Sequence, residues 1–173
     1  TDAGISREAR QYFELPSGAD AKPLPPLTEL VKIKGAAESG RKLFETTASC
    51  AKCHKVRGKG KDVGPDLSEI GSKLSREALF VSILDPSAGI SHNYETYLIE
   101  LVNGNVLSGV LISQTDQAVV LKTKEAIVKR VDRNEIELMR KSETSLMPAD
   151  LVKTMTKSQL ADIVAYLGSL RKQ

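Results

Sequence analysis

The residues whose spacing could do chemistry are Cys50, Cys53 and His54, in the sequence Cys-Ala-Lys-Cys-His. Two cysteines three positions apart and followed directly by histidine are typical of a c-type haem attachment site. Each thiol would add across one vinyl group of the porphyrin, so the two sulfurs must lie one helical turn apart. The histidine would then lie under the iron as its proximal ligand. The motif therefore predicts haem c, attached through Cys50 and Cys53, with His54 on the iron.

Three other interpretations of this motif are weaker. A thioredoxin-like redox pair needs a βαβ setting, which the flanking sequence does not offer. A structural zinc site needs four ligands, and the chain has no third cysteine to complete one. Two unmodified thiols beside a histidine are the last alternative. We favour haem attachment over these three together.

Length and composition predict a globular chain with room for one domain, or one domain with a sizeable insertion. The chain has 173 residues, of which 40% are hydrophobic and 27% charged. The net charge of +3, from 25 basic and 22 acidic residues, is too small to suggest nucleic-acid binding. No apolar run approaches the length of a membrane span. We expect neither a nucleic-acid partner nor a membrane span in this chain.

Basic residues are scattered, except for one cluster around the cysteine motif. This basic collar consists of Lys52, Lys55, Arg57, Lys59 and Lys61. It is either a solvated loop or a positive surface that steers an acidic redox partner toward the haem edge. The sequence favours neither alternative.

Residues 1–34 predict a lead-in rather than a compact element, because five breakers punctuate them: Pro16, Gly18, Pro23, Pro25 and Pro26. Such proline density favours an extended tether. We expect it to join the domain at 35–173 to an upstream part. Haem is attached covalently on the exported side of a membrane, and the chain begins at Thr1. We therefore expect a mature or excised piece of a periplasmic or otherwise exported protein.

Helical signals flank the cysteine motif on both sides. A helix over about 36–47 would carry Gly40 and Phe44 one turn apart on one face. A second helix would begin after the N-cap Ser75 and end at Asp85, because Pro86 disfavours helix at the residue before it.

The last helix is the clearest in the sequence. Thr156 and Gln159 have the spacing of a capping box at its start. An amphipathic stripe follows, flanked by Tyr166 and formed by Leu160, Ile163, Val164, Leu167 and Leu170.

The loop after the motif ends in Gly64, Pro65, Asp66 and Leu67. The carbonyl of Pro65 is free to accept a hydrogen bond from His54. Such a bond would fix the tautomer of the histidine and raise its basicity. The alternative, equally favoured by composition, is a simple turn before a short helix at 66–70.

The hydrophobic period changes to two after residue 94, which indicates strands. Tyr97, Ile99 and Leu101 alternate with polar residues, and Asn103-Gly104 is a strong hairpin signal. The return strand and further short strands at 118–121 and 126–131 follow. Over 132–138 the capping-box pair Asp132 and Glu135 predicts a turn of helix. Residues 94–138 therefore predict an antiparallel β unit of four or five strands inserted in a helical protein.

A second protein ligand to the iron could come from His92, Met139, Met147 or Met155. Met139 is expected in a surface turn, Met155 in the core and His92 in a loop. Met147 precedes Pro148 in an extended loop that could present its thioether to iron. The alternative is that Met147 is an ordinary core residue.

The order of these features resembles a class I cytochrome c. It is most similar to a haem-binding domain found at the C-termini of large exported planctomycete and verrucomicrobial proteins. The matching positions are Gly40, Leu43 and Phe44, residues 63–67, residues 83–87, Ile90, Tyr94, Gly104, Gly109, residues 145–148 and residues 162–167.

The resemblance covers about residues 36–170 and implies a mainly α fold of the class I cytochrome c type. The inserted β unit would be a small SH3-like barrel or sheet. The resemblance implies Cys50 and Cys53 as attachment residues, His54 as proximal ligand and Met147 as distal ligand. The helix with Gly40 should cross the helix with Tyr166. Candidate haem-pocket residues are Phe44, Gly64, Pro65, Leu67 and Tyr166.

The expected function is one-electron transfer by haem c with histidine and methionine ligation, without enzymatic activity of its own. Related architectures suggest a fused upstream or partner dehydrogenase as the electron donor. The alternative is a haem-based ligand sensor or a peroxidase-like enzyme with a labile distal site. The β unit would either dock a partner or shield the haem edge.

Overall fold

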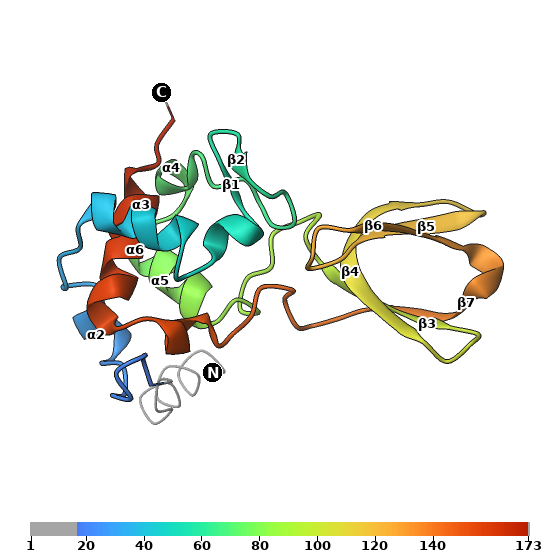
Figure 1. Cartoon of the computed structure of the whole chain (residues 1–173), viewed down its shortest axis with the longest axis horizontal. Helices are drawn as coiled ribbons and strands as arrows, with labels where there is room; N and C mark the ends of the chain where they lie inside the picture. Colours follow the sequence, from blue (N-terminus) through green and yellow to red (C-terminus); the bar gives the residue numbers. More distant parts are fainter. Residues whose placement is uncertain (1–16, 173) are drawn as a thin grey trace, which may run out of the picture.

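The computed structural model describes residues 17–172 and places helices at one end and a sheet at the other (Figure 1). Two extended segments join the ends (Figure 1). Helix accounts for 31% of the structure and strand for 24%. These proportions do not support the expectation of a mainly α protein, because the insertion forms five strands and takes a large share of the regular structure. Among the described residues, no helix combines the length and apolar character needed to cross a bilayer.

Among residues 17–172, the structure has five helices of differing length, all at the helical end. Three short 3₁₀ segments lie along the chain, and a small hairpin follows the cysteine motif. The helices are α2 (Leu27–Leu30), α3 (Ala37–Glu45), α4 (Ile70–Lys73), α5 (Arg76–Leu84) and α6 (Lys157–Ser169), of which α2 belongs to the lead-in. The 3₁₀ segments are η1 (Cys50–Lys52), η2 (Arg133–Glu135) and η3 (Leu151–Thr154), and the hairpin strands are β1 (Lys55–Val56) and β2 (Lys59–Gly60).

Helices α3 and α6 cross at Gly40, as the resemblance predicted. A side chain at Gly40 would overlap the backbone carbonyl of Asp162 and the Cβ of Tyr166. One turn later, the rings of Phe44 and Tyr166 meet edge to face, with centroids 5.6 Å apart and planes at 67°. The amide of Ala36 donates to the Asp162 carboxylate at 2.7 Å. The crossing therefore combines close backbone approach with an aromatic contact.

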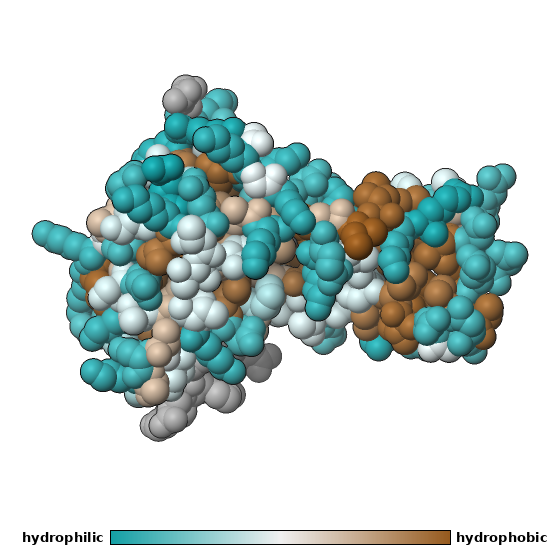
Figure 2. Space-filling model, viewed as in Figure 1, coloured by the Kyte–Doolittle hydropathy of each residue, from teal (hydrophilic) through white to brown (hydrophobic). Residues whose placement is uncertain are grey.

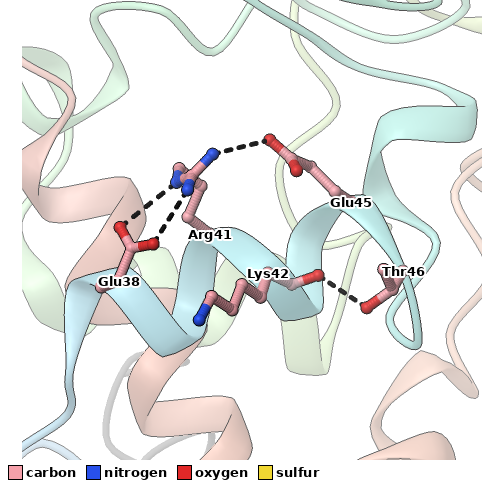
Figure 3. Close-up of polar contacts among 5 residues, drawn as sticks. All are labelled: Glu38, Arg41, Lys42, Glu45 and Thr46. Carbon is pink, nitrogen blue, oxygen red and sulfur yellow. Dashed lines mark hydrogen bonds and ion pairs between the residues drawn. The ribbon is translucent and has the colours of Figure 1, made fainter.

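The outer face of α3 carries charges (Figure 3). Arg41 pairs with Glu38 at 2.8 Å and with Glu45 at 3.6 Å, one turn away on either side. The hydroxyl of Thr46 donates to the Lys42 carbonyl at 2.6 Å and closes the helix end. Because these pairs are exposed, each contributes little to stability, and the buried face decides how α3 packs.

The predicted caps of α5 and α6 are confirmed. Ser75 Oγ accepts from the amide of Ala78 at 3.2 Å. At the start of α6, Thr156 and Gln159 exchange side-chain to backbone hydrogen bonds of 2.9 and 3.3 Å.

The short helix expected at 66–70 instead begins at Ile70. Asp66 accepts hydrogen bonds from the amide of Ser68, at 2.8 Å, and from its hydroxyl. These bonds make a local turn and hold the backbone out of helix for one further turn.

The lead-in is described from residue 17 onward, and its first sixteen residues lie outside the described part. Leu24 and Leu30 are buried in the helical core. The guanidinium of Arg76 donates to the carbonyl of Val31 at 3.0 Å. The described part is therefore not the extended tether that its prolines predict, because apolar residues between them reach the core.

The inserted sheet contains β3 (Thr96–Leu101), β4 (Val106–Gln114), β5 (Ala118–Lys122), β6 (Val128–Asp132) and β7 (Ile136–Lys141). All pairs are antiparallel, in the order β6-β5-β4-β3-β7. The sheet has its own small core of Ile99, Val119 and Leu121. The predicted antiparallel β unit is therefore present. Large exposed apolar side chains gather at this end of the molecule (Figure 2): Val102, Val106, Ile112, Ile127, Val128 and Leu138.

The turn of helix expected over 132–138 is present but spans only Arg133–Glu135, and a fifth strand follows it. The capping box of Asp132 and Glu135 is present, but it closes only the single turn η2. The chain then pairs with β3, so that Met139 lies opposite Ile99 rather than in a surface turn. At the base of the sheet, the amide of Ser142 donates to the Thr96 carbonyl at 2.8 Å. The free edge of β3 outweighs the local helical signal.

Replacing Gly40 with Ala should lower the free energy of unfolding by about 1–3 kcal/mol, because the added methyl meets backbone that cannot move independently. The matched control is Gly168→Ala on α6, where a Cβ meets no atom within 4 Å. This control should be neutral or stabilise by up to about 1 kcal/mol through helix propensity. Denaturant titration of both variants measures the difference. Equal stabilities would show that the α3–α6 crossing tolerates a side chain.

Candidate functional site

A cavity of about 620 Å³ is lined mainly by residues of the helical end, and its wall is largely apolar. The cysteine motif contributes Cys50, Cys53 and His54 to this wall. Among the predicted pocket residues, Phe44, Gly64, Pro65 and Leu67 also line it, and so does Met147. The structure therefore brings together residues that lie nearly a hundred positions apart.

Tyr166 is the predicted pocket residue that the structure places elsewhere. Its ring packs against the edge of Phe44 and lines a neighbouring hollow of about 570 Å³. Phe44 stands between the two spaces, since it lines both. Tyr166 therefore supports the cavity wall from behind.

A 3₁₀ turn places both thiols on the cavity wall. The amides of Cys53 and His54 both donate to the Cys50 carbonyl, at 3.0 and 2.9 Å. The turn follows Ser49, whose left-handed backbone (φ 56°) reverses the chain after α3. Cys50 and Cys53 are free thiols.

Burial keeps both thiols protonated near neutral pH. It raises the pKa of Cys50 to about 11. Burial also raises the pKa of Cys53, and the positive charges of Lys61 and Lys52 oppose this increase. Reactive redox cysteines and zinc ligands depend on the thiolate. The environment of these two thiols is therefore not one that activates them for such roles.

The imidazole of His54 is held by a hydrogen bond between its Nδ1 and the Pro65 carbonyl, at 2.8 Å. A carbonyl can only accept, so Nδ1 carries the proton and Nε2 of the neutral ring keeps its lone pair. Burial lowers the pKa of His54, and the bond to Pro65 opposes that decrease. Burial therefore favours the neutral ring, and the bond fixes its proton on Nδ1, which leaves Nε2 free to bind iron.

Gly64 allows the backbone to lie directly against the His54 ring. A Cβ at this position would overlap ring atoms of His54. The amides of Val63 and Gly64 donate to the Cys53 carbonyl, at 2.9 and 2.8 Å. The loop therefore returns to the cysteine motif before it supplies Pro65.

Two of the four candidates for a second iron ligand line the cavity, Met147 and Met155. Met155 is buried in the core, as expected, whereas Met147 is partly buried on an irregular segment with a bend at Leu146 and Met147. The amide of Met147 donates to Ser145 Oγ at 3.2 Å, and the Ser145 amide donates to Ser87 Oγ at 3.1 Å. These bonds hold the Met147 segment against the end of α5.

His92 and Met139 do not line the cavity. The His92 side chain is 88% exposed and lies 3.6 Å from the Glu95 carboxylate, in the loop where it was expected. Met139 packs within the sheet.

The basic collar divides between two surfaces. Lys52 and Lys61 line the cavity, while Arg57 and Lys59 line the neighbouring hollow. Lys55 lies 3.6 Å from the Asp62 carboxylate.

Sequence reasoning missed the contribution of the sheet to the cavity. Val110 of β4, together with Lys124 and Glu125 in the turn after β5, lines it. No local motif marks these residues, and their position follows from how the sheet packs on the helical end.

The wall fits a large apolar cofactor with an iron centre. It presents two thiols on one turn, a neutral imidazole with a free nitrogen, and a thioether on a separate segment. This is the donor set that haem c requires, with attachment through cysteine and axial coordination by nitrogen and sulfur.

Comparison with known proteins agrees with this geometry. Residues 37–100 match the family model described as cytochrome c, a range that includes the cysteine motif and ends within β3. No curated protein matches the chain. The match supports a haem-binding electron-transfer domain, and similarity to the cytochrome c family implies covalently bound haem c as its cofactor.

Proposed function

We propose that this domain is a one-electron carrier in which Cys50 and Cys53 hold the haem and His54 and Met147 are the axial ligands. The observation that carries the proposal is the orientation of His54. Its Nδ1 is committed to the Pro65 carbonyl, while the ring lines the cavity that Met147 also lines. Haem c supplies the one-electron iron couple when bound, and histidine with methionine raises its reduction potential.

The chain's own residues orient the ligands and exclude water. Pro65 keeps the proton of His54 on Nδ1, and Gly64 leaves room for the ring. Ser145 and Ser87 fix the segment that carries Met147. Buried apolar side chains complete the wall: Phe44, Val63, Leu79, Ile83, Ile163 and Leu167. A dry wall of this kind disfavours the more highly charged ferric state.

An acidic redox protein is the proposed partner. Lys52 and Lys61 of the basic collar lie on the cavity wall, where positive charge would steer such a partner. The donor is proposed to be a dehydrogenase, fused upstream or separate, in a periplasmic or otherwise exported setting. The domain itself is proposed to carry electrons without enzymatic activity.

The absorption spectrum of the reduced protein, before and after addition of carbon monoxide, tests the ligation. We expect a low-spin c-type spectrum that carbon monoxide leaves unchanged, because both axial positions are filled. Rapid carbon monoxide binding would instead favour the alternative of a sensor or a peroxidase-like enzyme with a labile distal site.

Replacing Met147 with Ala should open the distal position. The reduced variant should bind carbon monoxide, and its potential should fall by on the order of 0.1 V, because axial ligands tune haem over a wide range. Met155→Ala is the matched control, since Met155 lines the same cavity. It should lower the free energy of unfolding by about 2–5 kcal/mol yet leave the iron closed to carbon monoxide. The opposite pattern would assign the ligand to Met155.

Replacing Gly64 with Ala should displace the His54 ring, because the added methyl overlaps it. We expect the free energy of unfolding to fall by about 1–3 kcal/mol, with an increased high-spin fraction in the ferric spectrum. Gly168→Ala is the control for an added methyl away from the cavity. A wild-type spectrum and stability in Gly64→Ala would contradict the positioning role of this loop.

A further inference from the structure

The turn between β5 and β6 is part of the cavity wall, although it belongs to the inserted sheet. Lys124 and Glu125 of this turn line the cavity, as does Val110 on the neighbouring strand β4. In Figure 1 this turn is at the end of the sheet that faces the helices. Val110 is buried, and its register partner on the neighbouring strand β5 is the charged residue Lys122. The sheet and the helical end therefore share one apolar space.

Polar contacts fasten the turn to the loop that carries Pro65. Lys122 Nζ lies 3.1 Å from the Asp62 carboxylate and donates to the Asp62 carbonyl at 3.2 Å. Lys61 Nζ donates to the Glu125 carbonyl at 3.5 Å. The Lys122 side chain is 18% exposed, against 58% for Asp62, so the lysine is the half-buried partner.

The fastened loop is the one that orients the cysteine motif. Asp62 directly precedes Val63 and Gly64, whose amides donate to the Cys53 carbonyl. Lys61 is close enough to Cys53 for its charge to oppose the increase in the pKa of that thiol. The β5–β6 turn therefore lies on the side of the cavity where Cys53 stands.

We infer that Lys122 and Asp62 are positioning residues that seat the β5–β6 turn as a wall of the haem cavity beside Cys53. This wall limits the access of water and small solutes to that edge of the bound haem. The inference rests on the proposed haem site and adds a role for the inserted sheet. Release of the turn would admit water, stabilise the charged ferric state and lower the reduction potential.

The direction in which the reduction potential shifts in two single variants tests this inference. Lys122→Met and Asp62→Asn both break the ion pair, but they change the local charge in opposite directions. Charge alone predicts a lower potential for Lys122→Met and a higher one for Asp62→Asn, because positive charge disfavours ferric iron. A released wall predicts a lower potential for both.

Lys55→Met is the matched control. Lys55 lies near the same Asp62 carboxylate and loses the same charge, yet it has no contact with the sheet among the bonds of the described residues. Its potential should therefore follow the charge effect alone.

The measurements use the haem-loaded full chain. Oxidation of the reduced protein by a small uncharged quinone should be about threefold faster in Lys122→Met, as expected for loss of a partly exposed ion pair. In Lys55→Met the rate should change only as far as its potential changes. A threefold shift toward ferric iron corresponds to a potential about 28 mV lower, at 59 mV per tenfold change for one electron. Amide hydrogen exchange at Val63, Gly64 and Ala126 should accelerate in the same variants.

Opposite shifts of potential in Lys122→Met and Asp62→Asn, with wild-type quinone rates and amide exchange, would overturn the inference. Lower potentials in both, with faster oxidation and exchange, would support it. Carbon monoxide binding by the wild-type protein would contradict the proposed ligation instead. The two failures are therefore distinguishable.

Discussion

The hydrogen bond between His54 and the Pro65 carbonyl is the interaction on which the site depends. It commits one nitrogen of a buried ring and leaves the other free for iron. The bond requires Gly64 against the ring and the return of the loop to the Cys53 carbonyl. The same loop continues from Asp62, which meets the sheet. A single short segment therefore links the cysteine motif, the proposed iron ligand His54 and the insertion.

The crossing of α3 and α6 supplies the rigid background for that segment. Phe44 is held between Tyr166 and the cavity. The packing of the two helices therefore fixes the position of this part of the cavity wall. The Met147 segment comes from much later in the chain than the cysteine motif, shortly before α6. Residues from both ends of the domain thus converge because the two helices pack closely at Gly40.

Signals that act within a few residues were predictable from the sequence. The caps at Ser75 and Thr156, the β3–β4 hairpin and the bond from His54 to Pro65 all depend on near neighbours. Features set by distant contacts were not. The strand β7, the burial of Leu30 and the sheet's contribution to the cavity depend on surfaces formed elsewhere in the chain. Tyr166 was predicted to line the haem pocket, but it lies behind Phe44, and this position too depends on distant contacts.

The pairing at the base of the sheet has a consequence for how the chain folds. The hydrogen bond between Ser142 and Thr96 brings the two ends of the insertion together once the sheet has formed. Closing a loop costs more entropy as it lengthens, by about 0.6 kcal/mol per doubling. A preformed sheet makes the insertion equivalent to a short connection between α5 and the Met147 segment. Prior formation of the sheet therefore lowers the entropic cost of bringing the two parts of the helical end together, compared with an unstructured insertion of the same length.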